Sequence, residues 1–183
     1  MTDPKQRLRD AAIEYVAANG VGDISLRRLA AAIGTSHRML IYHFGSKEGL
    51  LVEIIRAVER QQRDALRDLE LAPGSTLADV GRLFWRRLAD PALWPNERLF
   101  FEVYGQALQG RPGTTALLDR IVEDWLDPLT GLLTRYGLAP DKARATARLG
   151  VAVSRGLLLD LLATGDRPGV DAAMERFIEL IDF

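Results

Sequence analysis

Residues 36–43 gather side chains whose types and spacing could read a nucleic acid. If Leu40 and Phe44 occupy the inner face of a helix, Arg38 and Tyr42 fall roughly opposite them, because residues four apart share a face. An arginine fork can bond the O6 and N7 atoms of one guanine together. We therefore expect Arg38 to be the residue that reads a base.

The neighbours of Arg38 suit supporting contacts. His37 falls in the first turn of the expected helix, near backbone N–H groups that can meet a phosphate. Met39 or Ile41 could pack on a thymine methyl group. Tyr42 and His43 are expected to donate to phosphate or sugar, contacts that fix register without reading sequence.

Two short helices must position these side chains. Apolar residues at helical spacing predict one helix over residues 26–33, with Ser25 as its cap and Gly34 after its end. Thr35 or Ser36 can cap a second helix that reaches Phe44. This arrangement is a helix-turn-helix candidate, although an ordinary corner between two bundle helices has the same spacing.

Composition limits the class of protein. The 183 residues include no cysteine, which excludes disulfides and thiolate chemistry, and carry a formal net charge of −1. Residues 1–50 are nevertheless basic and the remainder acidic, as expected of a DNA-binding end on an acidic body. No signal peptide is visible and the most apolar stretch, residues 149–163, is interrupted by charges. We expect a cytoplasmic chain with no membrane partner.

The rest of the chain predicts helices separated by proline and glycine. They are expected over residues 4–19, 47–71, 76–89, 96–108, 114–136 with a break at Pro128, 141–164 and from Val170 onward. No stretch alternates convincingly, so no strand is predicted. The fold class is therefore all-α, with about nine helices.

Three stretches carry a family resemblance: LRDAAIEYVAANG from Leu8, SLRRLAAAIGTS from Ser25 and YHFGSKEGLL from Tyr42. Together they closely resemble the DNA-binding domain of the tetracycline-repressor (TetR) family of bacterial transcriptional regulators. The resemblance implies a helix-turn-helix domain over residues 1–46, with its motif at about 25–44. It further implies a linking helix over 47–71 and an effector-binding and dimerisation domain over 47–183.

The resemblance also implies site residues. It places Ser36, His37, Arg38, Met39, Tyr42 and His43 on or beside the reading helix, Ser25 and Arg27 near the DNA backbone, and Lys47 on a phosphate. The sequence departs from the family pattern at Ile41, where members usually carry a tyrosine that contacts the DNA backbone. Here the aromatic residue stands one position later, at Tyr42.

Aromatic residues in the middle of the chain suggest a ligand cavity, the effector pocket that the resemblance implies. Each of them taken alone is more simply a core residue, but together they lie beside prolines that disrupt helix packing. Glu102 and Asp124 could help to orient a ligand. The predicted ligand-binding residues are Trp85, Phe101, Tyr104, Trp125 and Arg155.

Small and leucine side chains along residues 141–164 could pair two copies of the chain. With the last helix they would make the four-helix dimer interface that the resemblance implies, whereas a buried helix of a monomer is the alternative. A homodimer also explains operator reading by two half-sites. The predicted interface residues are Gly150, Ser154, Leu157, Leu158, Leu161, Phe177 and Ile181.

Taken together, these patterns favour a ligand-responsive regulator of transcription. We expect a repressor that binds a palindromic double-stranded DNA operator as a homodimer and is released by a small apolar or amphipathic effector. The alternative is a helical small-molecule-binding or interaction protein with a vestigial DNA-binding head. No catalytic motif, cofactor or metal site is expected, since His37 and His43 are six apart and lack a carboxylate or cysteine at ligand spacing.

Overall fold

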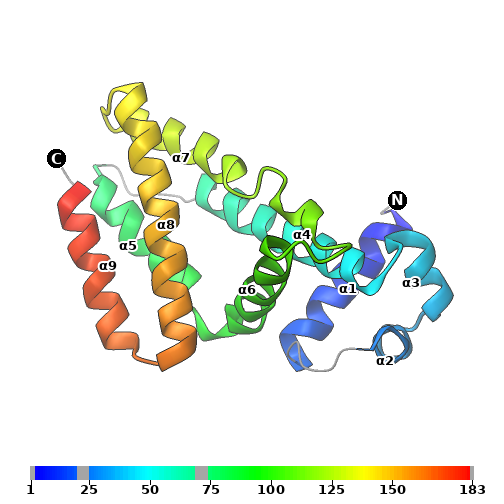
Figure 1. Cartoon of the computed structure of the whole chain (residues 1–183). Helices are drawn as coiled ribbons and strands as arrows, with labels where there is room; N and C mark the ends of the chain where they lie inside the picture. Colours follow the sequence, from blue (N-terminus) through cyan, green and yellow to red (C-terminus); the bar gives the residue numbers. More distant parts are fainter. Residues whose placement is uncertain (1–2, 20–24, 69–73, 182–183) are drawn as a thin grey trace. The chain divides into compact units, whose positions relative to one another are not determined.

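A computed structural model describes residues 3–19, 25–68 and 74–181 of the chain (Figure 1). Nine α-helices and no strand occur within these ranges, so the all-α prediction is confirmed. None of the described helices combines the length and apolar composition that crossing a bilayer requires. The helices are α1 Pro4–Asn19, α2 Leu26–Ala32, α3 His37–Phe44, α4 Lys47–Arg67, α5 Leu77–Leu88, α6 Trp94–Leu108, α7 Glu123–Arg135, α8 Pro140–Thr164 and α9 Arg167–Ile181.

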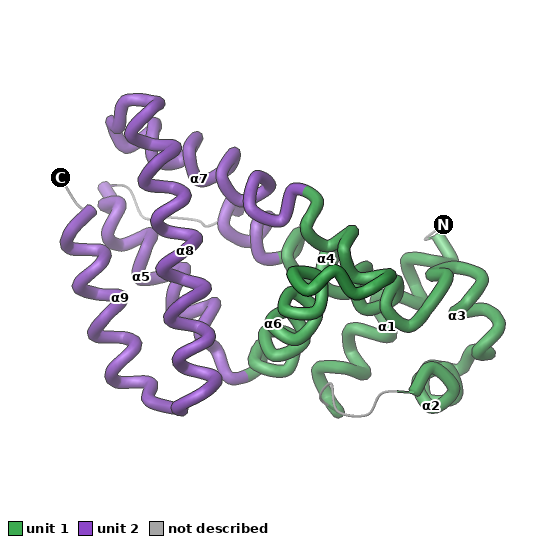
Figure 2. Tube along the Cα trace, viewed as in Figure 1, with its two compact units in different colours: residues 1–61, 92–119 green, residues 62–91, 120–183 purple. Residues whose placement is uncertain are grey.

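The chain divides into two compact units (Figure 2). Unit 1 comprises residues 1–61 and 92–119, and unit 2 comprises residues 62–91 and 120–183. The first unit therefore combines the predicted helix-turn-helix with α6 and the 3₁₀ turn η2, Thr115–Leu118. The predicted functional boundary after residue 46 falls inside unit 1 and stays a prediction about function.

Unit 1 is built around α1, which packs on both α2 and α6, while α2 packs on α3. Leu29, Leu40, Leu50 and Val103 are almost fully buried in it. Burial of each such side chain contributes about 1.5–3 kcal/mol relative to leaving it exposed. The same apolar core thus holds both short helices of the motif.

Unit 2 is a helical layer in which α8 packs on α7 and α9, and α5 packs on α9. The α5–α9 approach is close at Gly81, where an added Cβ would lie 3.2 Å from Ile178. Its main cluster of buried apolar side chains draws on α4, α5, α7 and α8, and includes Leu77, Val80, Trp125, Leu126 and Ala147.

Prolines that the sequence suggested as breaks begin helices instead. Pro95 lies in the first turn of α6 and Pro140 begins α8. Pro168 is likewise the second residue of α9. First-turn N–H groups have no partner within the helix, so proline costs no hydrogen bond there. The predicted starts at residues 96, 141 and 170 are therefore each too late.

The helix predicted over residues 114–136 is wrong in its first part. It begins only at Glu123 and then continues through Pro128 to Arg135. The interruption lies earlier, where Arg120 adopts a φ of 59° and its Nε donates to Asp124 Oδ1 at 2.9 Å. A proline inside a helix loses one hydrogen bond and crowds the carbonyl four residues earlier, at a cost of about 3 kcal/mol, yet the helix continues through Pro128.

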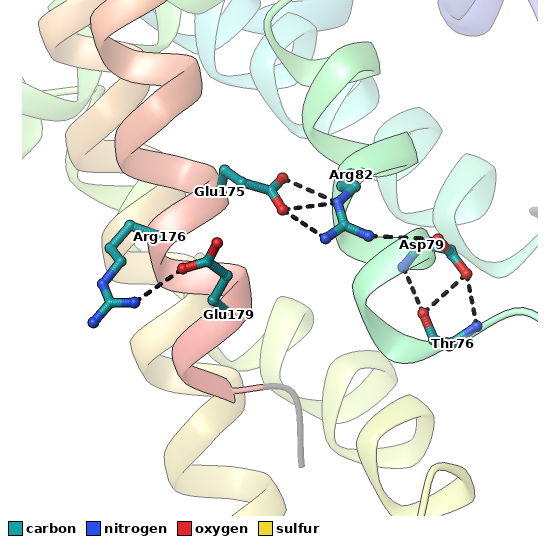
Figure 3. Close-up of polar contacts among 6 residues, drawn as sticks. All are labelled: Thr76, Asp79, Arg82, Glu175, Arg176 and Glu179. Atoms are coloured by element: carbon teal, nitrogen blue, oxygen red, sulfur yellow. Dashed lines mark hydrogen bonds and ion pairs between the residues drawn. The ribbon is translucent and has the colours of Figure 1, made fainter.

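A local network ties α5 to α9 in unit 2 (Figure 3). Thr76 and Asp79 form a capping box at the start of α5, and Arg82 Nε donates to both carboxylate oxygens of Glu175 at 3.0 Å. The Thr76 backbone bond holds the pKa of Asp79 below its ordinary 3.8. The Arg82 hydrogen bonds likewise hold the pKa of Glu175 below its ordinary 4.5.

Replacement of Glu175 should have a pH-dependent effect on stability. Because folding lowers the pKa of Glu175, its contribution is complete above the ordinary value of 4.5 and is lost as pH falls through the folded value. We expect Glu175→Gln to lower the thermal midpoint at pH 7, with the gap to the unmodified chain closing below pH 4.5.

The matched control is Glu179→Gln on the same helix. Glu179 pairs with Arg176 of α9 itself, so its loss breaks no contact between helices (Figure 3). Thermal denaturation followed by circular dichroism would measure both variants. A Glu175→Gln deficit that stayed constant down to pH 3 would contradict the assignment.

The junction between α3 and α4 generates a second prediction. A Cβ added at Gly49 would lie 2.2 Å from the Phe44 carbonyl oxygen, a backbone atom that already accepts from Ser46 N at 2.9 Å. Gly49→Ala should therefore cost about 1–3 kcal/mol of unfolding free energy through overpacking. It should also weaken any function that needs α3 correctly aimed.

Gly131 in α7 provides the control, since a Cβ there would meet nothing within 4 Å. Gly131→Ala should stabilise the chain by about 0.5–1 kcal/mol, because alanine favours a helix interior. Chemical denaturation would give both values. Equal effects of the two substitutions would show that the Phe44 carbonyl is not the constraint.

Candidate nucleic-acid interface

Local sequence signals fix the ends of helix α3. Ser36 Oγ accepts a hydrogen bond from Met39 N at 3.2 Å, so Ser36 is the N-cap. Gly45 ends the helix with a φ of 76°, a conformation that favours glycine. Leu40 and Phe44 are buried, which turns the opposite side of α3 to solvent.

The outward face of α3 consists of His37, Arg38, Met39, Ile41 and Tyr42. Tyr42 is 77% exposed, Met39 40% and Ile41 37%, while His37 and Arg38 are also exposed. Exposed apolar side chains that adjoin one another on one face often mark an interaction site. The face offers a guanidinium fork, a phenol hydroxyl and apolar surface, the groups that read base edges and thymine methyls.

Ile41 also belongs to this face, where the sequence suggested that it or Met39 could pack on a thymine methyl group. Family members usually carry a tyrosine at this position, whereas the exposed aromatic residue here is Tyr42.

Helix α2 presents a second set of groups. Ser25 Oγ caps α2 by accepting from Arg28 N at 3.2 Å, and its hydroxyl proton can still donate. Arg27 and Arg28 are exposed. No ion pair to Arg27, Arg28 or Arg38 forms within the part of the chain that the structure describes, so their charge is not locally neutralised.

The start of α4 provides a further anion position. Ser46 Oγ accepts from Gly49 N at 3.0 Å, and Lys47 is the first helical residue. First-turn N–H groups and the helix dipole favour a negative group here. Lys47 therefore stands where a phosphate contact was expected.

His43 does not join the outward face. Its Nε2 atom is buried and has no hydrogen-bond partner, and its ring lies 5.0 Å from that of Tyr42 and 6.3 Å from that of Phe44. The expected donation to phosphate is therefore not available to His43 Nε2. Residue 43 lies between the inner and outer sides of α3, where the helical wheel does not decide its orientation.

Two of the three basic residues of α1, Lys5 and Arg9, have an acidic partner. Lys5 lies 3.9 Å from Glu53 and 5.7 Å from the centre of the Phe44 ring. Arg9 pairs with Asp10 at 2.8 Å. Arg7 is exposed and has no ion pair among the described residues, so α1 adds one available positive charge to those of α2 and α3.

The predicted ligand-binding residues separate into two groups. Trp85 and Trp125 are buried in unit 2, where Trp85 Nε1 donates to Asp171 at 2.6 Å. Arg155 donates to the Ile121 carbonyl oxygen at 2.9 Å. For the tryptophans the structure supports the core interpretation.

Phe101 and Tyr104 lie on α6 in unit 1 and are half-buried. Tyr104 stacks on Phe100 at 5.3 Å, and Phe101 contacts the same ring edge-on at 5.2 Å. Of the two predicted orienting groups, Asp124 pairs with Arg63 at 3.7 Å, and exposed Glu102 accepts from Gln106.

A pocket that was not predicted lies between α4 and α6 in unit 1. It has a volume of about 10 Å³ and is lined by Ile54, Ile55, Val58, Glu59, Asn96, Glu97, Leu99 and Phe100. Glu59, Asn96 and Glu97 are nearly completely buried. The signal available in the sequence was Glu59, which falls on the apolar stripe of α4 four residues after Ile55. Among the described residues no group of three possible ligands could hold a metal ion.

The residues predicted for a dimer interface differ in their burial within the single chain. Leu158 and Leu161 are 4% and 0% exposed within the single chain, so they belong to its own core. Gly150, Ser154, Leu157, Phe177 and Ile181 are half-buried. The exposed stripe instead follows heptad spacing and contains Ala145, Leu149, Ala152, Gly156, Leu159 and Ala163.

Exposed leucines mark this surface clearly. Leu149 and Leu159 are each 51% exposed on α8, and Leu180 is 67% exposed on α9. A Cβ at Gly156 would meet nothing within 4 Å, so the stripe has room for a close neighbour. We call Leu149, Ala152, Gly156, Leu159 and Leu180 the α8–α9 face.

Comparison with known proteins agrees with this geometry. Residues 8–54 match the model of the bacterial regulatory proteins of the tetR family. Residues 96–180 match the model of the tetracyclin repressor-like C-terminal domain. The two matches together cover most of the chain and include α2, α3, the start of α4 and most of α6–α9.

Individual relatives support the same conclusion. The HTH-type transcriptional regulatory protein RaaS of Mycobacterium tuberculosis is 52% identical over 44 residues, which are 24% of this chain and 20% of that protein. The chain thus matches about a fifth of this relative's length. A transcriptional regulator from Rhodococcus sp. Rha1 has a TM-score of 0.76 at 20% identity, over 98% of this chain and 96% of that one.

The multidrug binding protein EbrR, solved in complex with proflavin, has a TM-score of 0.61 at 25% identity, over 96% of this chain and 99% of that one. The family models, the helix-turn-helix relative and the shared helical fold all point in one direction. The chain belongs to the TetR family of bacterial regulatory proteins and is a transcriptional regulator with a DNA-binding domain.

Proposed function

We propose that this regulator is a cytoplasmic repressor that reads a palindromic operator as a homodimer and is released by a small amphipathic effector. The outward face of α3 is the observation that carries the proposal. Arg38 stands exposed there with no ion pair among the described residues, beside the 77% exposed Tyr42. Arg38 would read a guanine, and Met39 and Ile41 would pack on thymine methyl groups.

Phosphate contacts would set the register of this helix on DNA. Ser25, Arg27 and Ser36 lie at the exposed starts of α2 and α3, and Lys47 begins α4. His37 lies in the first turn of α3, where free N–H groups favour an anion. These groups would supply affinity that depends on salt but not on base sequence.

The α8–α9 face supports pairing of two chains. Small residues at its centre allow close approach, and leucines flank them at heptad spacing. A two-fold pair would present two copies of α3 to two half-sites of one operator.

A connection within unit 1 supports control of α3 by an effector. The loop after α6 reaches the start of α4, where Arg111 pairs with Glu48 at 3.5 Å. A Cβ at Gly113 would lie 3.0 Å from Glu48 Cβ, so the loop packs tightly there. An effector that displaced α6 from α4 would shift this loop and the helix that follows α3, and would favour the state that does not bind DNA.

A mobility-shift experiment tests the proposal as a whole. The full chain would be titrated onto DNA flanking its own gene and, separately, onto a scrambled duplex. We expect a complex on the first duplex at concentrations that leave the second free. Equal retention of both duplexes would contradict operator reading.

Two substitutions separate base reading from phosphate binding. Arg38→Ala should cost about 1–3 kcal/mol at one base position of the operator. Lys47→Ala should weaken binding to all sequences alike and lower the salt slope by about one. Fluorescence anisotropy with single-base operator variants at several salt concentrations would measure both effects.

The control for these two substitutions is Arg176→Ala. Arg176 is exposed on α9 and pairs with Glu179, so its loss removes the same charge away from α3. It should leave the site preference and the salt slope unchanged. An unchanged site preference in Arg38→Ala would remove that residue from base reading.

A charge placed on the α8–α9 face should separate the dimer. Leu159→Glu puts a carboxylate into the apolar stripe, and we expect sedimentation velocity to show a shift towards monomer with a parallel loss of operator affinity. Leu108→Glu is the control, since Leu108 is 64% exposed on α6, outside the face. A Leu159→Glu chain that remained dimeric would place the interface elsewhere.

A further inference from the structure

The outward face of α3 carries an exposed sulfur atom, that of Met39. The residue is 40% exposed and lies in the first turn of the helix, where its backbone N–H donates to Ser36 Oγ. Leu40 and Phe44 hold the opposite side of α3 in the core. The Met39 thioether is therefore open to small reagents in solution, and a chemical change to it leaves the packing of the helix in place.

No other sulfur atom in the described part of the chain competes for such a reagent. Met174 of α9 is 4% exposed, and Met1 lies outside the described residues. The 183 residues contain no cysteine, the side chain that oxidants otherwise attack readily. Among residues 3–19, 25–68 and 74–181, Met39 is thus the one thioether that an oxidant in solution can reach directly.

The polarity of the Met39 side chain matters because of its neighbours. Ile41 is 37% exposed on the same face, and Tyr42 is 77% exposed about one helical turn further on. In the proposed complex, Met39 and Ile41 supply apolar surface for thymine methyl groups. Oxidation turns the thioether into a polar sulfoxide, whose oxygen accepts hydrogen bonds. A sulfoxide pressed against a methyl group loses water and gains no donor, so oxidation should weaken the complex.

We propose that Met39 is an oxidation site through which hypohalous acids weaken operator binding. The sulfur lone pair attacks the chlorine of hypochlorous acid and releases hydroxide. Hydroxide then displaces chloride from the sulfur and loses its proton, which leaves the sulfoxide. The sulfur is oxidised by two electrons and the chlorine is reduced by two, so the products are sulfoxide, chloride and one proton. This inference rests on the proposed function and adds a chemical signal at the same face of α3.

The modification is reversible in chemical terms. Methionine sulfoxide reductases return the thioether by spending two thiols, with a disulfide and water as the other products. Because α3 keeps its core contacts throughout, the reduced chain should recover the original face without refolding.

Oxidation of the full chain tests the chemistry. The protein would be treated with increasing equivalents of hypochlorous acid at pH 7, and peptide mass spectrometry would locate each added oxygen atom. We expect Met39 to be oxidised before Met174, with no change in the helical circular dichroism signal. Earlier oxidation of Met174, or unfolding as soon as Met39 is oxidised, would overturn the proposal.

Operator affinity of the same samples tests the consequence. We expect fluorescence anisotropy to show about tenfold weaker binding after oxidation, equivalent to about 1.4 kcal/mol. Methionine sulfoxide reductase with a thiol should restore the original affinity. A chain oxidised at Met39 that binds its operator as before would contradict the inference.

Substitutions separate Met39 from damage elsewhere. The operator affinity of Met39→Leu, whatever its starting value, should be the same before and after treatment, because the reactive sulfur is gone. Met39→Gln places a polar group of similar length on the face and should weaken binding without any oxidant. The matched control is Met174→Leu, which should remain as sensitive to the oxidant as the unmodified chain. Loss of affinity in treated Met39→Leu would assign the effect to another residue and reject the proposal.

DNA present during the treatment distinguishes this inference from the proposed function. Bound operator should slow the oxidation of Met39, whereas a scrambled duplex at the same concentration should not. Equal oxidation rates with both duplexes would place Met39 outside the interface and overturn the inference. An untreated chain that binds no operator contradicts the proposed function and this inference with it, whereas operator binding that survives oxidation of Met39 contradicts this inference alone.

Discussion

The close approach of Gly49 to the Phe44 carbonyl constrains the angle between α3 and α4, on which the DNA-binding domain depends. That carbonyl also accepts from Ser46 N, and Gly45 turns the chain between them with a φ of 76°. Two glycines and one serine cap therefore fix the angle between α3 and α4. Leu40 and Phe44 are buried on the inner side of α3, so the opposite side faces outward. The angle between α3 and α4 sets the direction in which that outward side points.

Helix α4 connects the turn after α3 to the pocket between α4 and α6. Its first turn contacts the loop after α6 through Glu48, and its next turns supply Ile54, Ile55 and Glu59 to the pocket wall. A rigid helix transmits a displacement along its length. The ion pair between Arg111 and Glu48, which holds the loop after α6 against α4, can break and form again. Arg56 adds a bond to the Ala116 carbonyl oxygen in η2. The loop thus touches α4 at two successive points.

The helix ends that could be predicted from the sequence are those set by local capping residues. The ends of α2 and α3 follow from Ser25, Ser36 and Gly45, whose capping roles depend only on their neighbours. The predicted helix starts were wrong at prolines because proline is found both after the end of a helix and in the first turn of one. Proline fits the first turn because the N–H groups there have no partner within the helix. Pro128 shows the converse, since packing outweighs the loss of one hydrogen bond.

Features that depend on tertiary packing could not be predicted in the same way. The side of α8 that faces its own core is set by α7 and α9, so the sequence alone did not separate the buried Leu158 from the exposed Leu159. The orientation of His43 depends on the Tyr42 and Phe44 rings. Burial of Glu59 and Asn96 likewise requires α4 and α6 to meet, which no local pattern indicates.

The proposed DNA-binding face and the proposed route of release use different helices of unit 1. The exposed arginines of α2 and α3 attract a polyanion, whereas the loop after α6 contacts α4 through Arg111 and Glu48. An effector that acts on α6 would therefore not have to compete with DNA for the face of α3. Coupling of this kind is reciprocal, so operator DNA must weaken effector binding by the same factor by which the effector weakens operator binding.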